Sequence, residues 1–339
     1  MKPFAARIPS SAARRRARRT LCQLALAGAA LAACGSVAAS EAWPDRPVRL
    51  IAPFSPGAAT DQVTRVLAQQ LSDQLDTSFV VENRTGAAGR IAADAVVKAA
   101  ADGYTALFGE PGGLVVAPAV YTATTTFDTE RDLIPVAQVV SMPMVVVAHP
   151  SLGVSNLAEL KAAATRGHLN YGTNGTGSVQ HLTMETLADQ LEVPLTHIPY
   201  RGGANAITDL VAGQIQLSLL TIPTVEAYIK SGQVVPLAVL DAERSPVLPH
   251  TATAREQGLE GLDVPIWCGF FLPAGTPPAI VERFSAELGK ALQDPQIQDR
   301  LAKAGNTVTY RNHDAFQRWV ADDVARWRAI VQNTGVQLD

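Results

Sequence analysis

The sequence has few charges, few aromatic residues and hardly any cysteine. Of its 339 residues, 17% are charged and 6% are aromatic, whereas 47% are hydrophobic and the net charge is −3. This balance excludes an intrinsically disordered chain, which needs low hydrophobicity and high net charge, and a strongly basic nucleic-acid-binding protein. A folded protein remains, and its length predicts two domains that are each large enough to bury a core of their own.

The three cysteines, Cys22, Cys34 and Cys268, do not form a disulfide framework. The first two lie in a segment that we expect to be cleaved off. If Cys34 is retained, its thiol would carry a lipid, so in either case no pair of cysteines is left to form a disulfide. Cys268 lies between Trp267 and Gly269 in an apolar run. We predict that it is a buried small hydrophobic residue rather than a nucleophile.

Signatures of common enzymes and nucleotide sites are also missing. The chain has no G-x-S-x-G elbow and no Gly-Lys-Ser/Thr phosphate loop, and the glycines of 172–178 reverse the order of the dinucleotide fingerprint. His181 follows Ser178 by three residues, a spacing that suits a nucleophile and its base but also helix capping. His181 and Glu185 are one turn apart without a third metal ligand. We therefore expect no catalysis, metal or cofactor, and keep a secreted hydrolase as an alternative.

The first 39 residues are typical of an export signal. They carry seven basic residues and no acidic one, the apolar run Leu21–Ala33 is too short to span a bilayer, and Val37–Ala39 supplies small residues for cleavage. Removing this segment leaves 21 basic residues (28 minus 7) against 31 acidic ones, a net charge near −10 that does not suit nucleic acid. We predict a signal peptide at 1–39 and a periplasmic protein.

Two motifs leave the export route and the anchoring of the mature protein open. Arg18 and Arg19 loosely resemble a twin-arginine signal, although the flanking residues depart from it, so both this route and general secretion stay possible. The run Leu31–Gly35 resembles a lipobox, in which Cys34 would carry the lipid of a bacterial lipoprotein. A permanent transmembrane anchor is not expected.

Beyond Trp43 the chain alternates between short β-rich runs and longer helical patterns. One set of alternations covers residues 48–108 and a second covers 169–220, and this rhythm predicts parallel strands with helices packed on them. Three more helices are predicted between residues 277 and 330. The last of them carries a stripe of Phe and Trp residues, which we interpret as core packing.

Two long apolar runs flank the second set. They are Val139–Ala148, interrupted by Pro143, and Ile266–Pro273, and they predict two crossings of the chain between domains. The predicted fold class is therefore α/β, with two mostly parallel sheets flanked by helices. Domain 1 is expected to combine residues 40–143 and 266–339, and domain 2 to span residues 144–265.

Four strand-to-helix junctions are rich in small residues at the point where a helix would begin. They are residues 54–61, 84–89, 172–178 and 200–204. A helix N-terminus combines unpaired N–H groups with partial positive charge, and in parallel sheets such loops lie at the carboxyl ends of the strands. Each loop alone is ordinarily a cap or a turn, but four of them in two predicted domains favour an anion held between the domains.

The ordered set of motifs resembles the Bug-type (TctC-like) extracytoplasmic solute receptors of tripartite tricarboxylate transporters. The likeness extends from Trp43 to about Val336 and includes W-P-D-R-P-V-R at 43–49, the four loops, D-G-Y-T at 102–105, D-L-V-A-G at 209–213 and P-A-G-T-P at 273–277. It implies a two-domain type II periplasmic binding protein that closes on a small carboxylate like a Venus flytrap. It also implies delivery of that ligand to membrane transporter subunits, and we expect a monomer.

The resemblance carries ligand-binding residues over by position. The first, third and fourth loops would line the cleft, and Thr85, Gly86 and Ala87 of the second would stand nearby. The residues of the three cleft loops are Phe54, Ser55, Gly57, Ala58 and Asp61; Thr173, Gly175, Thr176, Gly177, Ser178 and His181; and Tyr200, Arg201, Gly202 and Ala204.

One departure from the family pattern bears on the ligand. After the strand at 104–108, where the family commonly has small hydroxyl residues, this chain has Gly109 and Glu110. We predict that Glu110 faces the cleft and pairs with a nitrogen of a mixed-charge ligand, which adds amino-acid-like and pyridine-carboxylate compounds to the candidates. An outward-pointing Glu110 is the alternative. A periplasmic sensor that signals occupancy to a receptor is the alternative function.

Overall fold

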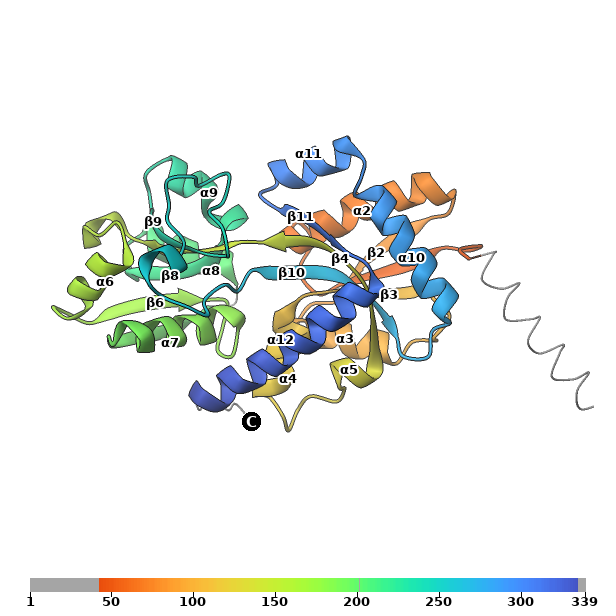
Figure 1. Ribbon diagram of the computed structural model, residues 1–339, viewed down its shortest axis with the longest axis horizontal. Helices are drawn as coiled ribbons and strands as arrows, with labels where there is room; N and C mark the ends of the chain where they lie inside the picture. The colour runs from red at the N-terminus through yellow and green to blue at the C-terminus, as the bar shows by residue number, and fades with distance from the viewer. Residues whose placement is uncertain (1–42, 201, 335–339) are drawn as a thin grey trace, which may run out of the picture. The chain divides into compact units, whose positions relative to one another are not determined.

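Two β-sheets with flanking helices make up the computed structural model, which describes residues 43–200 and 202–334 (Figure 1). The elements below all belong to the unit Arg46–Asp339. The first sheet has six strands in the order β11-β4-β10-β3-β1-β2 and the second has five in the order β7-β6-β8-β5-β9. The strands are β1 Val48–Ala52, β2 Phe79–Asn83, β3 Thr105–Gly109, β4 Leu133–Met142, β5 Met144–Ala148, β6 Leu169–Thr173, β7 Leu195–Pro199, β8 Leu217–Thr221, β9 Val235–Leu240, β10 Ile266–Pro273 and β11 Thr307–Arg311.

Helices pack on both sheets. On the six-stranded sheet, α2 packs with α10 and α11, and α12 packs with α4 and η2, and the two groups lie on opposite faces of the strands (Figure 1). On the five-stranded sheet, α8 and α9 pack on β8, and α7 packs on β7 and β8. The helices are α2 Ala59–Leu75, α3 Arg90–Val97, η2 Gly112–Val116, α4 Ala117–Val120, α5 Thr129–Asp132, α6 Leu157–Ala164, α7 Val179–Leu191, α8 Gly203–Val211, α9 Ile222–Lys230, α10 Pro278–Ala291, α11 Pro295–Lys303 and α12 His313–Thr334, with short turns η1 Ala87–Gly89, η3 Pro150–Leu152 and η4 Arg255–Gln257.

The α/β class and the two-sheet architecture are confirmed, but the sheets are mixed rather than mostly parallel. Strand β1 pairs in parallel with β2 and β3, and β6 pairs in parallel with β7 and β8. Strand β10 runs antiparallel to β3 and β4, β11 to β4, and β5 to β8 and β9. The apolar runs form β4, β5 and β10. The direction of these strands depends on which strands they pair with, and local periodicity does not predict it.

The chain leaves the first sheet for the second at Pro143, which stands between β4 and β5. Proline lacks an N–H group and therefore ends a strand ladder cleanly. Its carbonyl accepts a hydrogen bond from the N–H of Ile222, at the start of α9. The chain returns to the first sheet in the segment between Leu240 and Ile266. The two predicted crossings are thus present in the order of the strands.

Helix α12 covers the first sheet with the aromatic stripe expected from the sequence. Phe316, Val320 and Trp327 are at most 2% exposed, as is Trp267 of β10, whose indole N–H donates to the buried carboxylate of Asp323 at 2.7 Å. These contacts confirm that the stripe belongs to the core. Among the described residues we find no helix that combines the length and apolar character needed to cross a bilayer. The predicted signal peptide, twin arginines and Cys34 lie outside the described residues.

Replacing Gly269 with alanine is expected to destabilise the protein by about 1–3 kcal/mol, because the core has no room for a methyl group there. A Cβ at Gly269 would lie 2.5 Å from the carbonyl oxygen of Ala137 and 2.5 Å from the ring of Phe316. The matched control is Gly167→Ala, where nothing lies within 4 Å. Urea unfolding of both variants measures the difference, and equal midpoints would contradict the packing described here.

Candidate functional site

Two of the four junctions predicted from the sequence, residues 54–61 and 84–89, meet at one edge of the six-stranded sheet. Parallel pairing places Ala52 of β1 opposite Asn83 of β2, so the loops after both strands leave from the same edge. These loops also approach each other closely, because a Cβ built on Gly89 would lie 3.2 Å from the Cβ of Pro53. The segment after β3 joins them, since Gly113 lies so near the carbonyl of Ala88 that a Cβ would be only 2.6 Å away.

The side chain of Asp61 holds the first loop in place. Asp61 is the third residue of α2, and its carboxylate accepts hydrogen bonds from the N–H of Gly57 (2.8 Å), Nε of Arg65 (2.9 Å) and Nδ2 of Asn83 (2.8 Å). Burial alone would raise the pKa of this carboxyl, but the bonds from Arg65, Gly57 and Asn83 together lower it. Asp61 is therefore a charged residue that holds the loop in place, and both of its carboxylate oxygens already accept hydrogen bonds from the protein.

The backbone of this loop suits the residues at positions 57 and 58. Gly57 has φ +84°, which favours glycine, whereas Ala58 has φ −63° and ψ 158°, an extended conformation that suits alanine without strain. The N–H of Ala58 donates to the carbonyl of Ser55 at 3.1 Å, and the carbonyl of Phe54 accepts Nδ2 of Asn83 at 2.8 Å. Ser55 and Gly57 are exposed.

Glu110 does not take the position expected for it. Its side chain is buried, and its two carboxylate oxygens accept the N–H groups of Gly112 (2.9 Å) and Gly113 (3.1 Å) at the start of η2. Burial raises the pKa of this carboxyl to about 7, partly offset by these two bonds. The helix start attracts the nearest anion, and here that anion is the chain's own carboxylate, so no outward or ligand-facing carboxylate results.

Two neighbours of Glu110 are also inside the protein. Gly109 is buried in β3 opposite Gly269, and a Cβ there would lie 2.5 Å from Leu114 and 2.9 Å from Phe271, so Gly109 packs in the core instead of lining a ligand surface. Cys268 is a fully buried free thiol, as predicted. Burial raises the pKa of this thiol, and Glu110 adds to the effect. Such a thiol is a poor nucleophile.

The third and fourth loops meet at the edge of the five-stranded sheet. Strand β6 pairs in parallel with β7, with Thr173 opposite Pro199, and the N–H of Tyr200 donates to the carbonyl of Thr173 at 3.1 Å. The start of α8 at Gly203 adjoins Asn174, whose Oδ1 would lie 3.2 Å from a Cβ at that glycine. The sequence-predicted residues of both loops are therefore neighbours, except Arg201, which lies outside the described residues.

Ser178 and His181 form a cap rather than a catalytic pair. Ser178 is the N-cap of α7, and its Oγ accepts the N–H of His181 at 3.2 Å. In return, Nδ1 of His181 accepts the N–H of Gly177 at 3.1 Å. The arrangement is related to a capping box, but the side chain at the third helical position bonds the N–H of the residue before the N-cap instead of that of the N-cap itself. The imidazole is thus turned away from the hydroxyl and does not activate it.

Two residues that support this loop, His197 and Tyr171, were not among those predicted from the sequence. The ring of His181 stacks on that of His197 with centroids 3.8 Å apart, and the ring of Tyr171 also stacks on His197, at 5.1 Å. His197 Nε2 lies 2.6 Å from Oγ1 of Thr173. The signal was the strand alternation, because Tyr171 and His197 each stand two residues before the end of adjacent strands and occupy matching register positions.

Unpaired backbone donors remain at the starts of three helices. No described residue accepts a hydrogen bond from the first two N–H groups of α2, α7 or α8, which are Ala59 and Thr60, Val179 and Gln180, and Gly203 and Ala204. These are the orphan groups of helix N-termini, and they suit an anion. The hydroxyl of Thr60 is also buried without a partner among the described side chains.

The charges around these helix starts are unequal. The first turn of α2 contains Asp61, whereas the first turns of α7 and α8 contain no acidic residue. Burial lowers the pKa of His181, although Glu185 opposes this, so the residue at the matching position of α7 is neutral near pH 7. A carboxylate therefore meets less repulsion at α7 and α8 than at α2.

One hydrogen bond links the third loop to the first sheet's helices. The hydroxyl of Tyr121, directly after α4, donates to the carbonyl of Thr176 at 3.1 Å, and the guanidinium of Arg90 lies over the ring of Tyr121 at 4.5 Å. Tyr200 is committed elsewhere, because its hydroxyl donates to Asp209 at 2.8 Å. Burial, together with Asp209, raises the pKa of Tyr200 to about 12.

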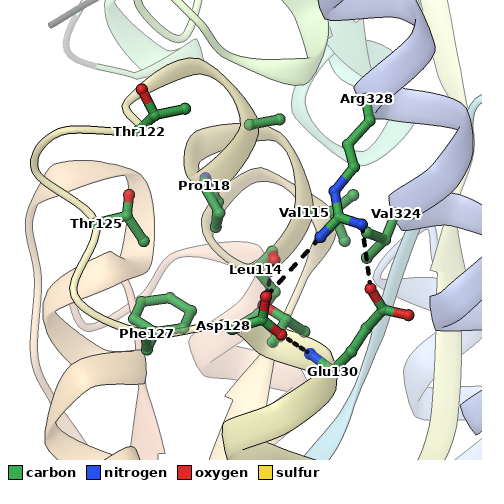
Figure 2. A pocket seen from close by; sticks show the side chains of 12 residues that line it. Leu114, Val115, Pro118, Thr122, Thr125, Phe127, Asp128, Glu130, Val324 and Arg328 are labelled. Carbon is green, nitrogen blue, oxygen red and sulfur yellow. Dashed lines mark hydrogen bonds and ion pairs between the residues drawn. The ribbon is translucent and has the colours of Figure 1, made fainter.

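A separate pocket of about 230 Å³ lies between the η2–α4 segment and α12 (Figure 2). Leu114, Val115 and Val324 form apolar parts of its wall, and Arg328 at its rim pairs with Asp128 (3.9 Å) and Glu130 (3.4 Å). None of the predicted ligand-binding residues lines this pocket. Within the described part of the chain, no group of three or more His, Cys, Asp or Glu residues is arranged to hold a metal.

Comparison with known proteins identifies close relatives. The family model described as "Tripartite tricarboxylate transporter family receptor" matches residues 63–336. Protein BugT of Bordetella pertussis (strain Tohama I) is 33% identical over 319 residues, which are 93% of this chain and 98% of BugT. A structure of Rpa4515 of R. palustris with adipate has a TM-score of 0.79 and 33% identity over 86% of this chain and 98% of that one. MatC from Rhodopseudomonas palustris with bound malate has a TM-score of 0.76 and 31% identity over 85% and 100% of the two chains.

Glu110→Gln tests the buried carboxylate through the pH dependence of stability. The folded state holds the proton of Glu110 more tightly than the unfolded chain, so stability falls as the pH rises from 4.5 towards 7. The raised pKa, about 7 against 4.5, corresponds to roughly 3 kcal/mol. We expect the unfolding free energy of the wild type to drop by about that amount relative to Glu110→Gln between pH 4.5 and pH 8.

The control for this measurement is Glu260→Gln, at an exposed glutamate. Urea unfolding at both pH values gives the four differences required. If the unfolding free energies of the wild type and Glu110→Gln differ by the same amount at both pH values, the carboxyl of Glu110 does not have the raised pKa described here.

Proposed function

This chain belongs to the tripartite tricarboxylate transporter receptor family, and from that premise we propose that it captures a small carboxylate in the periplasm and delivers it to the membrane subunits of such a transporter. The observation that carries the proposal is the set of unpaired amides at the starts of α7 and α8, whose first turns contain no acidic residue. Backbone donors at a helix N-terminus bind an anion without a basic side chain.

The ligand we propose is a simple carboxylate rather than a zwitterion. Structures of two relatives contain adipate and malate, both of which are dicarboxylates. The case for an amino-acid-like or pyridine-carboxylate ligand was a free Glu110, and the carboxylate of Glu110 is instead bonded to Gly112 and Gly113. With that acceptor occupied, a ligand gains nothing there from an amine or a ring nitrogen.

The energetics favour donors from both sheets acting together. Micromolar binding requires about −8 kcal/mol, and each hydrogen bond to a charged group contributes roughly 1.5–3 kcal/mol before the cost of association. The amides of α7 and α8 can supply several such bonds, and those of α2, with the buried hydroxyl of Thr60, can supply more. We propose that closure of domain 144–265 on domain 40–143 and 266–339 brings these donors onto one ligand.

The same proposal covers location, assembly and chemistry. The periplasmic binding protein BugD has a structure similar to this chain, at 33% identity. We propose that residues 1–39 of this chain form a cleaved signal peptide, with lipidation of Cys34 as a variant of the same route. The receptor is proposed to act as a monomer and without catalysis, in keeping with the capping role of Ser178 and His181. A sensor that reports occupancy to a signalling receptor would use the same site and differ in its partner.

Val179→Pro is expected to weaken carboxylate binding about 10- to 100-fold, because it deletes one N–H donor to a charged group. Proline is well tolerated as the first residue of a helix, and the preceding Ser178 has the extended conformation (φ −75°, ψ 160°) that proline requires. Isothermal titration of the mature protein with adipate and with malate measures the effect.

Val179→Ala is the matched control, because it trims the same buried side chain but keeps the N–H group. We expect it to bind the carboxylates as the wild type does while lowering stability slightly. If Val179→Pro binds adipate and malate as tightly as Val179→Ala does, the α7 amides are not the anion site. If neither compound, nor any mono- or tricarboxylate, amino acid or pyridine carboxylate, raises the melting temperature of the wild type, the proposed function is wrong.

A further inference from the structure

We propose that the stacked imidazoles of His181 and His197 set the shape of the loop Thr173–Ser178 and release it when a proton binds, so that the receptor holds its carboxylate at neutral pH and lets it go at acid pH. The proposal rests on the proposed function, because the carboxylate is the ligand of that same loop. His181 is then a positioning residue that acts through Gly177, not a group that touches the ligand.

Both rings are bonded to the loop they support. Nδ1 of His181 accepts the N–H of Gly177, and Nε2 of His197 lies 2.6 Å from Oγ1 of Thr173. That hydroxyl in turn accepts the N–H of Gly175 and donates to its carbonyl, both at 3.2 Å. The turn that presents the first amides of α7 is therefore held at both ends by one pair of imidazoles.

The hydrogen bond to Gly177 requires His181 to be neutral. A backbone N–H can donate only to an unprotonated Nδ1, so the ring proton resides on Nε2, which faces Oε1 of Glu185 at 3.8 Å. A proton added at Nδ1 would turn this atom into a hydrogen-bond donor that faces another donor, the N–H of Gly177. Gly177 would then lose its acceptor, and the loop would have to move away from the ring.

The surroundings of the pair oppose its protonation. His181 is buried and His197 is half-buried, their rings are 3.8 Å apart, and two imidazolium charges at that distance repel strongly. Burial, followed by the influence of His181, lowers the pKa of His197 to about 4, and burial also lowers that of His181. Both rings are therefore mainly neutral near pH 7, and the folded state takes up protons on them at lower pH than a free histidine does.

The groups that face the pair come from three elements. Glu185 on α7 is the one described carboxylate that pairs with either ring, and it raises the pKa of His181 against the effect of burial. Tyr171 on β6 stacks on His197 and donates its hydroxyl to Glu185, and Thr173 on β6 is neutral. Because Glu185 compensates the charge of a protonated His181, the loss of loop geometry outweighs any attraction of the imidazolium for the ligand.

The corresponding position of α2 shows why the response is confined to one sheet. Asp61 is also the third residue of its helix and also accepts the N–H of the residue before the N-cap, Gly57. Its bonds to Arg65, Gly57 and Asn83 lower the pKa of that carboxyl from 3.8 against the effect of burial, so Asp61 is charged at pH 5.0. Acid thus releases the α7 loop while the α2 loop stays clamped.

The decisive variant is His181→Gln, because glutamine at the third helical position offers an acceptor to the loop but does not titrate. Titrations with malate at pH 7.5 and pH 5.0 are compared for the wild type and this variant. Between pH 7.5 and pH 5.0 we expect the wild type to lose about tenfold more affinity than His181→Gln loses. The titration of malate itself is common to both proteins and cancels in the ratio.

Two further variants separate positioning from general damage. His181→Ala removes the acceptor and is expected to weaken binding at both pH values, with rescue by His181→Gln. His197→Phe keeps a stacked ring that does not titrate and is expected to leave the acid response of His181 in place, because His197, with its pKa lowered to about 4, carries no charge near pH 5. An equal acid response in the wild type and His181→Gln, or tighter binding by the wild type at pH 5.0, would overturn the proposal.

A readout without ligand distinguishes this inference from the proposed function. In the ligand-free mature protein labelled with ¹⁵N, the amide resonance of Gly177 should move with the same midpoint as the imidazole nitrogens of His181, and should not move in His181→Gln. If the resonance follows the ring but no carboxylate binds, the loop coupling holds and the proposed function fails. If the resonance stays constant while His181 titrates, the coupling is wrong even where malate binds.

Discussion

The hydrogen bond from the residue before an N-cap to the third side chain of the helix organises both candidate loops. In α2 it joins Gly57 to Asp61 and in α7 it joins Gly177 to His181. Each bond closes a turn at the carboxyl end of a strand, and the N-cap amide that follows is also bonded within the turn, from Ala58 to Ser55 and from Ser178 to Gly175. The first two amides of each helix then have no acceptor among the described residues, because no intrahelical carbonyl precedes them.

The identity of the residue in that third position separates the two helices. A charged carboxylate in α2 cancels part of the positive potential of its own helix, whereas a neutral imidazole in α7 does not. Glu110 is a third example, because its carboxylate accepts hydrogen bonds from the amides of Gly112 and Gly113, which are then not available to a ligand. The protein thus decides by its own side chains which helix starts stay available to an external anion.

Sequence patterns were reliable wherever the deciding contacts are local. The helix Val179–Leu191 lies within the second predicted set of alternations, and the cap formed by Ser178 and His181 is one of the two interpretations that their spacing allowed. The strands β1 and β6 begin where the two predicted sets begin, at residues 48 and 169, whereas β11, whose side chains are mostly half-exposed, was not predicted. These successes have one cause, because capping and periodicity depend on residues only a few positions apart.

What the sequence by itself determined was the α/β class, the two crossings and the loops rich in small residues at strand ends. Only the tertiary structure decided that the sheets are mixed, that Glu110 turns inward, and that His197 stacks on His181 across two elements. The reason is physical. Contacts between residues that are distant in the chain decide the direction of a strand, the burial of a charge and the stacking of two rings. A local sequence pattern does not report the free energy of such contacts.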